Sequence, residues 1–152
     1  MPASPHVMIV EAPYYAHIAE ELASGAVEAL DAAGASYERF AVPGALEIPA
    51  AIRIAIEARG HDMKRRFDGY VALGCVIRGE TTHYDYVCAE SAHGLQQIAL
   101  QYGVAIGFGI LTVENEAQAP ARARVDRKNK GGEAACACLA MIALKRQFGN
   151  RS

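Results

Sequence analysis

The 152-residue sequence lacks the features that mark several classes of protein. Its longest nearly apolar runs fall well short of the roughly 18 residues that a membrane-spanning helix requires. The formal net charge is -2 at pH 7, and the densest basic stretch, residues 121–130, is typical of a solvated loop. We therefore expect neither nucleic-acid nor membrane binding. The first ten residues hold no positive region followed by an apolar block, so we expect no secretory signal.

The sequence also lacks a CxxC pair and any histidine at zinc-ligand spacing from its cysteines. The four cysteines are Cys75, Cys88, Cys136 and Cys138, and three of them lie in strongly apolar segments. We interpret them as small buried hydrophobic residues that stay reduced in a cytoplasmic protein. No metal site is expected.

What is present is the composition of an ordinary globular domain. Hydrophobic residues make up 52% of the chain and charged residues 21%. The length suits one domain, and the sequence shows no internal repeat or low-complexity linker. We expect a single domain over residues 1–152, with residues 1–6 as a flexible amino terminus.

Apolar runs alternate along the chain with segments of helical periodicity. The pattern predicts strands over residues 6–12, 36–42, 67–77 and 104–113, and helices over 16–34, 43–60, 84–102, 115–124 and 131–148, the fourth of them interrupted at Pro120. Continuous apolar strands joined by helices indicate a parallel sheet covered on both faces. The predicted fold is an α/β three-layer αβα sandwich with a four-stranded parallel sheet.

Ligands of such sheets bind outside the carboxyl ends of the strands, and the third strand ends in "VIRGETTHYDY". Thr82 and Asp85 resemble a capping box, which predicts a helix that begins near His83. The first backbone N–H groups of that helix would favour an anion, and Gly79 would let the anion approach closely. Arg78 could assist. A capped helix start without a ligand is the alternative.

Three further groups lie at strand ends. Near the positive end of a helix dipole, His83 suits proton transfer near pH 7, although a surface histidine is the ordinary alternative. Glu47 either contacts a ligand or only complements a helix dipole. Tyr14 and Tyr15 either stack on a planar ligand or cover the core.

Two features of the last third of the chain have a structural explanation that we favour. Phe108 lies between Gly107 and Gly109, where it either fills the core, as we expect, or faces a ligand. Arg122 and Lys130 could bind a phosphate, but a solvated basic loop explains them as well. Taken alone, the residues predict an anion site beside a histidine and do not identify a reaction.

Four blocks, "VPGALEIP", "LGCVIRGETTHYDYV", "GFGILTVENEAQA" and "NKGGEAA", resemble lumazine synthase, the penultimate enzyme of riboflavin biosynthesis. The resemblance runs from Ile9 to Phe148. It implies a flavodoxin-like fold and a transferase without a metal or organic cofactor. Such an enzyme joins 5-amino-6-(D-ribitylamino)uracil to 3,4-dihydroxy-2-butanone 4-phosphate. An imine forms, phosphate leaves, and the ring closes to 6,7-dimethyl-8-ribityllumazine.

The resemblance also implies roles for individual residues. His83 would transfer protons. The phosphate would be bound by Gly79, Glu80, Thr81 and Arg122. The other substrate would contact Tyr14, Tyr15, Ala45, Leu46, Glu47, Cys75, Val76, Ile77, Phe108 and Lys130. Phe108 would come from a neighbouring subunit, because the resemblance implies active sites between the subunits of a homopentamer. Some members assemble into sixty-subunit shells.

The chain departs from the family pattern at three places. Pro13-Tyr14-Tyr15 stands where Arg-Phe-Asn is common, Cys75 where a threonine is frequent, and Pro120 is unusual in its short helix. The change at Tyr15 motivates an alternative, a weakly active protein that binds riboflavin or a lumazine on the same scaffold. A mainly structural shell protein is a third hypothesis, but it would need neither His83 nor Arg122.

Overall fold

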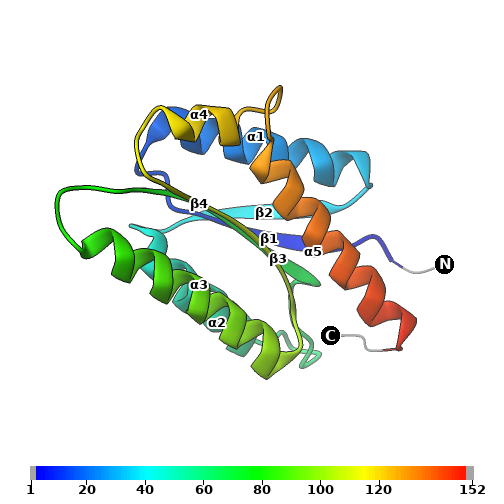
Figure 1. Ribbon diagram of the computed structural model, residues 1–152. Helices are drawn as coiled ribbons and strands as arrows, with labels where there is room; N and C mark the ends of the chain where they lie inside the picture. Colours follow the sequence, from blue (N-terminus) through cyan, green and yellow to red (C-terminus); the bar gives the residue numbers. More distant parts are fainter. Residues whose placement is uncertain (1–2, 150–152) are drawn as a thin grey trace.

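The computed structural model describes residues 3–149 as a parallel β-sheet between two layers of helices (Figure 1). The elements are β1 (His6–Glu11), α1 (Ala16–Ala32), β2 (Ser36–Ala41), the 3-10 turn η1 (Ala45–Glu47), α2 (Ile48–Glu57), β3 (Gly69–Ile77), α3 (His83–Tyr102), β4 (Ala105–Val113), α4 (Gln118–Ala123) and α5 (Lys130–Gln147). Helices α1, α4 and α5 cover one face, and α2 and α3 the other. The predicted three-layer, flavodoxin-like fold is confirmed.

The four strands are parallel, in the order β2-β1-β3-β4. The chain adds β2 on one side of β1 and then β3 and β4 on the other, so the order of the strands reverses between β1 and β3. Ligands of open parallel sheets bind at such a reversal, beyond the carboxyl ends of the strands. The last registered pair of β1 and β3 is Glu11 with Leu73, and β3 continues to Ile77. The end of β3 therefore stands beside the residues that follow β1.

Each face of the sheet has its own hydrophobic core. Under α1 and α5, Ile9 packs with Leu22 and Cys138, and under α2 and α3, Val10 packs with Ile52. Helix α5 lies directly on β4, because a Cβ at Gly107 would come within 1.9 Å of the carbonyl oxygen of Ala134. The buried residues of α1 recur at helical spacing, namely Ile18, Leu22, Ala23, Gly25, Ala26 and Leu30.

The structure corrects two details. Helix α4 continues through Pro120, its third residue, because an N–H in the first turn has no partner within the helix. Of the cysteines, Cys138 is buried, Cys75 and Cys88 are half-buried, and Cys136 is exposed. The expectation of burial is thus wrong for Cys136.

Across residues 3–149, no helix combines the length and apolarity needed to cross a membrane.

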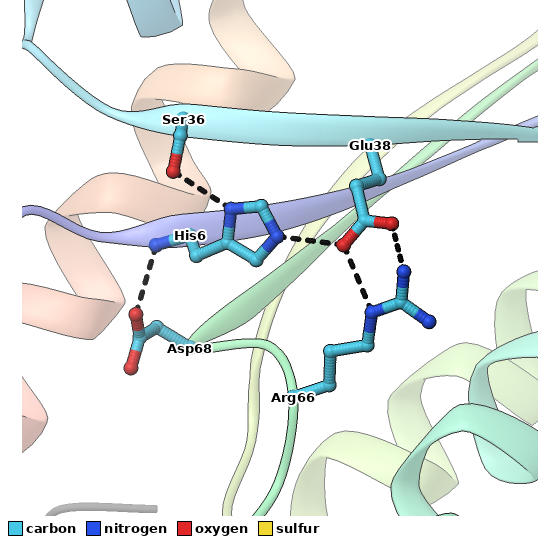
Figure 2. Close-up of polar contacts among 5 residues, drawn as sticks. All are labelled: His6, Ser36, Glu38, Arg66 and Asp68. Carbon is cyan, nitrogen blue, oxygen red and sulfur yellow. Dashed lines mark hydrogen bonds and ion pairs between the residues drawn. The ribbon is translucent and has the colours of Figure 1, made fainter.

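A polar network joins the strands at the amino end of the sheet (Figure 2). The carboxylate of Glu38 accepts from His6 Nε2 at 2.7 Å and forms an ion pair with Arg66. His6 Nδ1 lies 2.7 Å from the Ser36 hydroxyl, and the His6 backbone N–H donates to Asp68 at 2.8 Å. The network therefore fixes β1 to β2 and to the segment before β3.

Candidate active site

A cleft of about 390 Å³ opens at the carboxyl ends of β1 and β3. Its position is the one expected for a ligand site in this topology. The lining residues are Ala12, Tyr14, Tyr15, Pro43, Gly44, Ala45, Leu46, Glu47, Cys75, Val76, Ile77, His83 and Val87. Nine of the predicted site residues meet here, namely Tyr14, Tyr15, Ala45, Leu46, Glu47, Cys75, Val76, Ile77 and His83.

The two tyrosines form one wall of the cleft. Pro13 follows β1, and α1 begins at Ala16 with Tyr15 as its N-cap residue. The two rings meet edge to face, with centroids 4.9 Å apart. Tyr15 is half-buried against the core, whereas Tyr14 is 76% exposed. Tyr15 therefore packs against the core while it lines the cleft, and Tyr14 presents its ring to the cleft.

The turn after β2 forms another wall of the cleft. Ala45 is buried and anchors η1, while Leu46 and Glu47 remain exposed. A Cβ at Gly44 would lie 3.4 Å from Glu47 Oε1, so the carboxylate folds back over this turn. No side chain caps α2, and Pro49 occupies its first turn. Glu47 therefore offers acceptor oxygens at the rim of the cleft.

The end of β3 forms the floor. Cys75, Val76 and Ile77 are half-buried, and Cys75 and Ile77 pack against the core under α1 and α5. Burial, together with the charge of Glu116, raises the pKa of the Cys75 thiol to about 11. The thiol stays protonated at neutral pH and is a poor nucleophile. Cys75 therefore contributes shape and a weak donor to the floor.

His83 is the first residue of α3, as the sequence predicted. Its backbone N–H donates to Thr81 Oγ1 at 3.3 Å, and the exposed side chain borders the cleft. The predicted capping box is wrong, because Thr82 makes no side-chain cap. Asp85 instead pairs with Arg78. The backbone N–H of Asp85 donates to the Thr82 carbonyl at 3.0 Å, so among the first three N–H groups of α3 only that of Tyr84 is left to bind an anion.

The predicted phosphate loop, Gly79, Glu80 and Thr81, is exposed and connects two cleft residues, Ile77 and His83. It stands at the rim of the cleft rather than within it. The suggestion that Arg78 assists an anion directly finds no support, because its guanidinium is bound to Glu114 at 2.5 Å and to Asp85 at 3.2 Å.

Three predicted site residues lie outside the cleft. Phe108 is 46% exposed and lines a separate hollow between α3 and β4, so its expected core-filling role is wrong. The guanidinium of Arg122 donates to the Gln118 carbonyl at 3.0 Å. Lys130 begins α5 and pairs with Glu133 at 3.1 Å. A single chain does not bring these side chains to the cleft.

Four lining residues were not predicted from sequence as site residues, namely Ala12, Pro43, Gly44 and Val87. Val87 is four positions after His83, so the two share one face of α3. That helical spacing was the available signal. Within residues 3–149, no three histidine, cysteine or acidic side chains are grouped so that they could hold a metal ion.

Comparison with known proteins identifies the family. The family described as 6,7-dimethyl-8-ribityllumazine synthase matches residues 4–146. The chain belongs to the 6,7-dimethyl-8-ribityllumazine synthase family. It is 58% identical over 144 residues to the 6,7-dimethyl-8-ribityllumazine synthase of Sphingopyxis alaskensis, which covers 95% of this chain and 97% of that protein. The enzyme of the same name from Bartonella tribocorum is 55% identical over 150 residues, covering 99% and 96%.

A third relative, 6,7-dimethyl-8-ribityllumazine synthase 1 of Rhizobium meliloti, is 53% identical over 144 residues, covering 95% of this chain and 94% of that protein. All three similarities extend over nearly the full length. The segments that build the cleft, from residue 12 to residue 87, therefore lie within the region matched by the family.

Proposed function

We propose that the cleft is where this chain condenses 5-amino-6-(D-ribitylamino)uracil with 3,4-dihydroxy-2-butanone 4-phosphate. The product is 6,7-dimethyl-8-ribityllumazine, an intermediate of riboflavin biosynthesis, and phosphate is released. Membership of the family supports this reaction. The observation that carries it in the structure is the meeting of His83, an exposed helix N-terminus and the Tyr14 ring at one cleft.

In this proposal each residue of the site has a role. The imidazole of His83 transfers protons during imine formation and ring closure. The backbone of Gly79, Glu80 and Thr81 binds the phosphate at the start of α3. The ring of Tyr14 stacks on the uracil, and Glu47 accepts hydrogen bonds from the ribityl hydroxyls. Holding both substrates together supplies much of the acceleration.

The remaining lining residues complete the uracil pocket in this proposal. Tyr15 and the Cys75 thiol shape its inner end, where the half-buried floor excludes water. The backbone of Ala45 and Leu46 contacts the ribityl chain. The backbone of Val76 and Ile77 contacts the uracil edge, since β3 continues past its last pairing with β1 and presents N–H and C=O groups on that side.

We also propose that the complete site forms between subunits of a homopentamer. Phe108, Arg122 and Lys130 lie outside the cleft of their own chain, which supports their contribution to a neighbouring cleft. The exposed Phe108 ring also gives the outer face of β4 an apolar patch suited to a subunit contact.

We also propose that residues 1–152 form one domain and that the protein is cytoplasmic. Two cores on either side of one sheet support a single folding unit. All four cysteines are free, which suits a reducing compartment.

The first experiment follows formation of the lumazine by its absorbance, with the spontaneous reaction as baseline. The wild-type rate should lie well above that baseline. His83→Ala should slow turnover by roughly ten- to ten-thousand-fold, the range of general acid–base catalysis. His93→Ala, an exposed histidine further along α3, is the matched control and should keep the wild-type rate.

An unchanged rate for His83→Ala at saturating substrate would remove this histidine from the mechanism. A wild-type rate equal to the baseline, together with tight binding of riboflavin or the uracil, would instead favour the alternative of a binding protein. The altered Tyr15 position motivates that alternative and would then be the residue to restore to asparagine.

A further inference from the structure

Arg78 is the residue just before the loop of residues 79–82, and it contacts the elements on both sides of that loop. Its backbone N–H donates to the Val113 carbonyl at 2.9 Å, which extends the pairing of β3 with β4. Its Nε donates to Glu114 Oε2 at 2.5 Å, and its Nη2 donates to Asp85 Oδ1 at 3.2 Å. One guanidinium therefore spans from the end of β4 to the first turn of α3.

The guanidinium also packs against an aromatic ring. Its carbon lies 4.4 Å from the centre of the Tyr84 ring, and Tyr84 is buried. A planar cation held by two carboxylates and a ring has little freedom to reorient. The loop is thus flanked by Arg78 on one side and, on the other, by Tyr84 and Asp85 of α3, which the Arg78 side chain contacts.

We infer that Arg78 is a positioning residue that holds the loop of residues 79–82 in the conformation that binds the phosphate-bearing substrate. The inference rests on the proposed function, because it assigns Arg78 a task in the same site. Arg78 acts through the loop backbone and does not itself touch the phosphate, since its guanidinium is already bound to Glu114 and Asp85.

A purely stabilising role does not explain this arrangement. Arg78, Asp85 and Glu114 are all more than a third exposed, and ion pairs in such positions contribute little to folding stability. Geometry is more sensitive, because a misplacement of about 1 Å in a site can cost about a hundredfold in rate. The cluster is therefore better placed to fix the loop than to hold the fold together.

The same cluster reaches the helix that carries Arg122. The backbone N–H of Glu114 donates to Gln118 Oε1 at 2.8 Å, and Arg122 Nη1 donates to the Gln118 carbonyl at 3.0 Å. Glu114 thus joins the loop on one side and α4 on the other. Glu114→Gln would weaken the contact with Arg78 and keep the backbone contact with Gln118.

The test compares Arg78→Met and Arg78→Lys with the wild type in the lumazine assay. For Arg78→Met, the KM for the butanone phosphate should rise about tenfold, within the sensitivity expected for a misplaced contact. Arg78→Lys keeps the positive charge but loses the planar guanidinium. Its KM for the butanone phosphate should lie between those of the wild type and Arg78→Met. The KM for the uracil should not change. The inhibition constant of inorganic phosphate should rise in parallel with the KM for the butanone phosphate.

Arg53→Met is the matched control. Arg53 pairs with Glu57 at 2.8 Å and lies 4.8 Å from the centre of the Tyr102 ring, so it makes the same kinds of contact at the far end of α3. It should leave both KM values unchanged. Thermal unfolding of each variant checks that the fold is retained.

Two results would overturn the inference while leaving the proposed function intact. One is an active wild type with an unchanged KM for the butanone phosphate in Arg78→Met and Arg78→Lys. The other is an equal rise in both KM values, which would indicate a general loss of structure. A wild type without activity above baseline would refute the proposed function and, with it, this role of Arg78.

Discussion

Replacing Gly79 with alanine tests whether this glycine is required for folding stability or for binding of the phosphate. A Cβ at Gly79 would meet no atom within 4 Å, and the backbone there is not in the left-handed region. The fold therefore has no need of glycine at this position. We expect the free energy of unfolding of Gly79→Ala to stay within about 0.5 kcal/mol of the wild-type value.

The effect on substrate binding should be much larger. If the loop backbone binds the phosphate, a methyl group on the loop keeps the anion from at least one N–H group. A hydrogen bond to a charged group contributes about 1.5–3 kcal/mol. At about 1.4 kcal/mol for each factor of ten, the KM for the butanone phosphate should rise about ten- to a hundredfold.

The assay varies the butanone phosphate at saturating uracil and follows lumazine absorbance. Gly107→Ala is the contrasting variant, because its Cβ would lie 1.9 Å from the Ala134 carbonyl oxygen and must displace α5. Overpacking of this kind costs about 1–3 kcal/mol or more in stability. An unchanged KM in Gly79→Ala would refute phosphate binding by this loop, as would an equal rise in the KM for the uracil.

Two further predictions concern opposite ends of the sheet. Arg122→Ala should weaken binding of the butanone phosphate, and a change confined to the affinity for the uracil would contradict a phosphate role. At the amino end, hydrogen bonds from His6 and Arg66 lower the pKa of Glu38. A carboxyl group with a lowered folded-state pKa stabilises the fold above its unfolded pKa, about 4.5, and loses that contribution as the pH falls through the folded value. Melting temperatures of the wild type should therefore exceed those of Glu38→Gln at pH 7 and approach them under acid conditions; a constant difference would contradict the pairing.

Much of the fold could be predicted because the relevant signals are local. Apolar runs and helical spacing locate the four strands and the long helices, and the location of α3 puts His83 at the helix start. Tyr14, Tyr15, Glu47 and His83 could be predicted from the strand ends, since parallel strands place these at one edge. The resemblance to the family implied the other five predicted cleft residues, namely Ala45, Leu46, Cys75, Val76 and Ile77. The capping box failed because Thr82 has helical backbone angles, φ -73° and ψ -2°, whereas a capping residue is usually extended, and because Asp85 engages Arg78. The contact of Arg78 with Glu114, 36 residues away, depends on the register of β3 with β4, which the sequence does not reveal.

The position of Phe108 could not be predicted for a similar reason. The glycines on either side indicate a close approach but not the face on which the ring lies. In the structure, Phe108 shares the hollow beside α3 with Ile106, on the face of an edge strand that α3 leaves partly open. Whether an edge strand is covered depends on the packing of a helix far along the chain, or on another subunit.

The two ends of the sheet differ in whether their polar side chains have hydrogen-bond partners. At the amino end, His6 and Arg66 both bind the carboxylate of Glu38, so these polar groups are engaged within the chain. At the carboxyl end, the side chains of Glu47 and His83 have no hydrogen-bond partner within residues 3–149 and face the cleft. Helix N-termini gather at the same end because the crossovers of a parallel sheet place them there. Substitutions at the amino end should therefore change stability without changing KM, whereas those at the carboxyl end should change KM or kcat without changing stability.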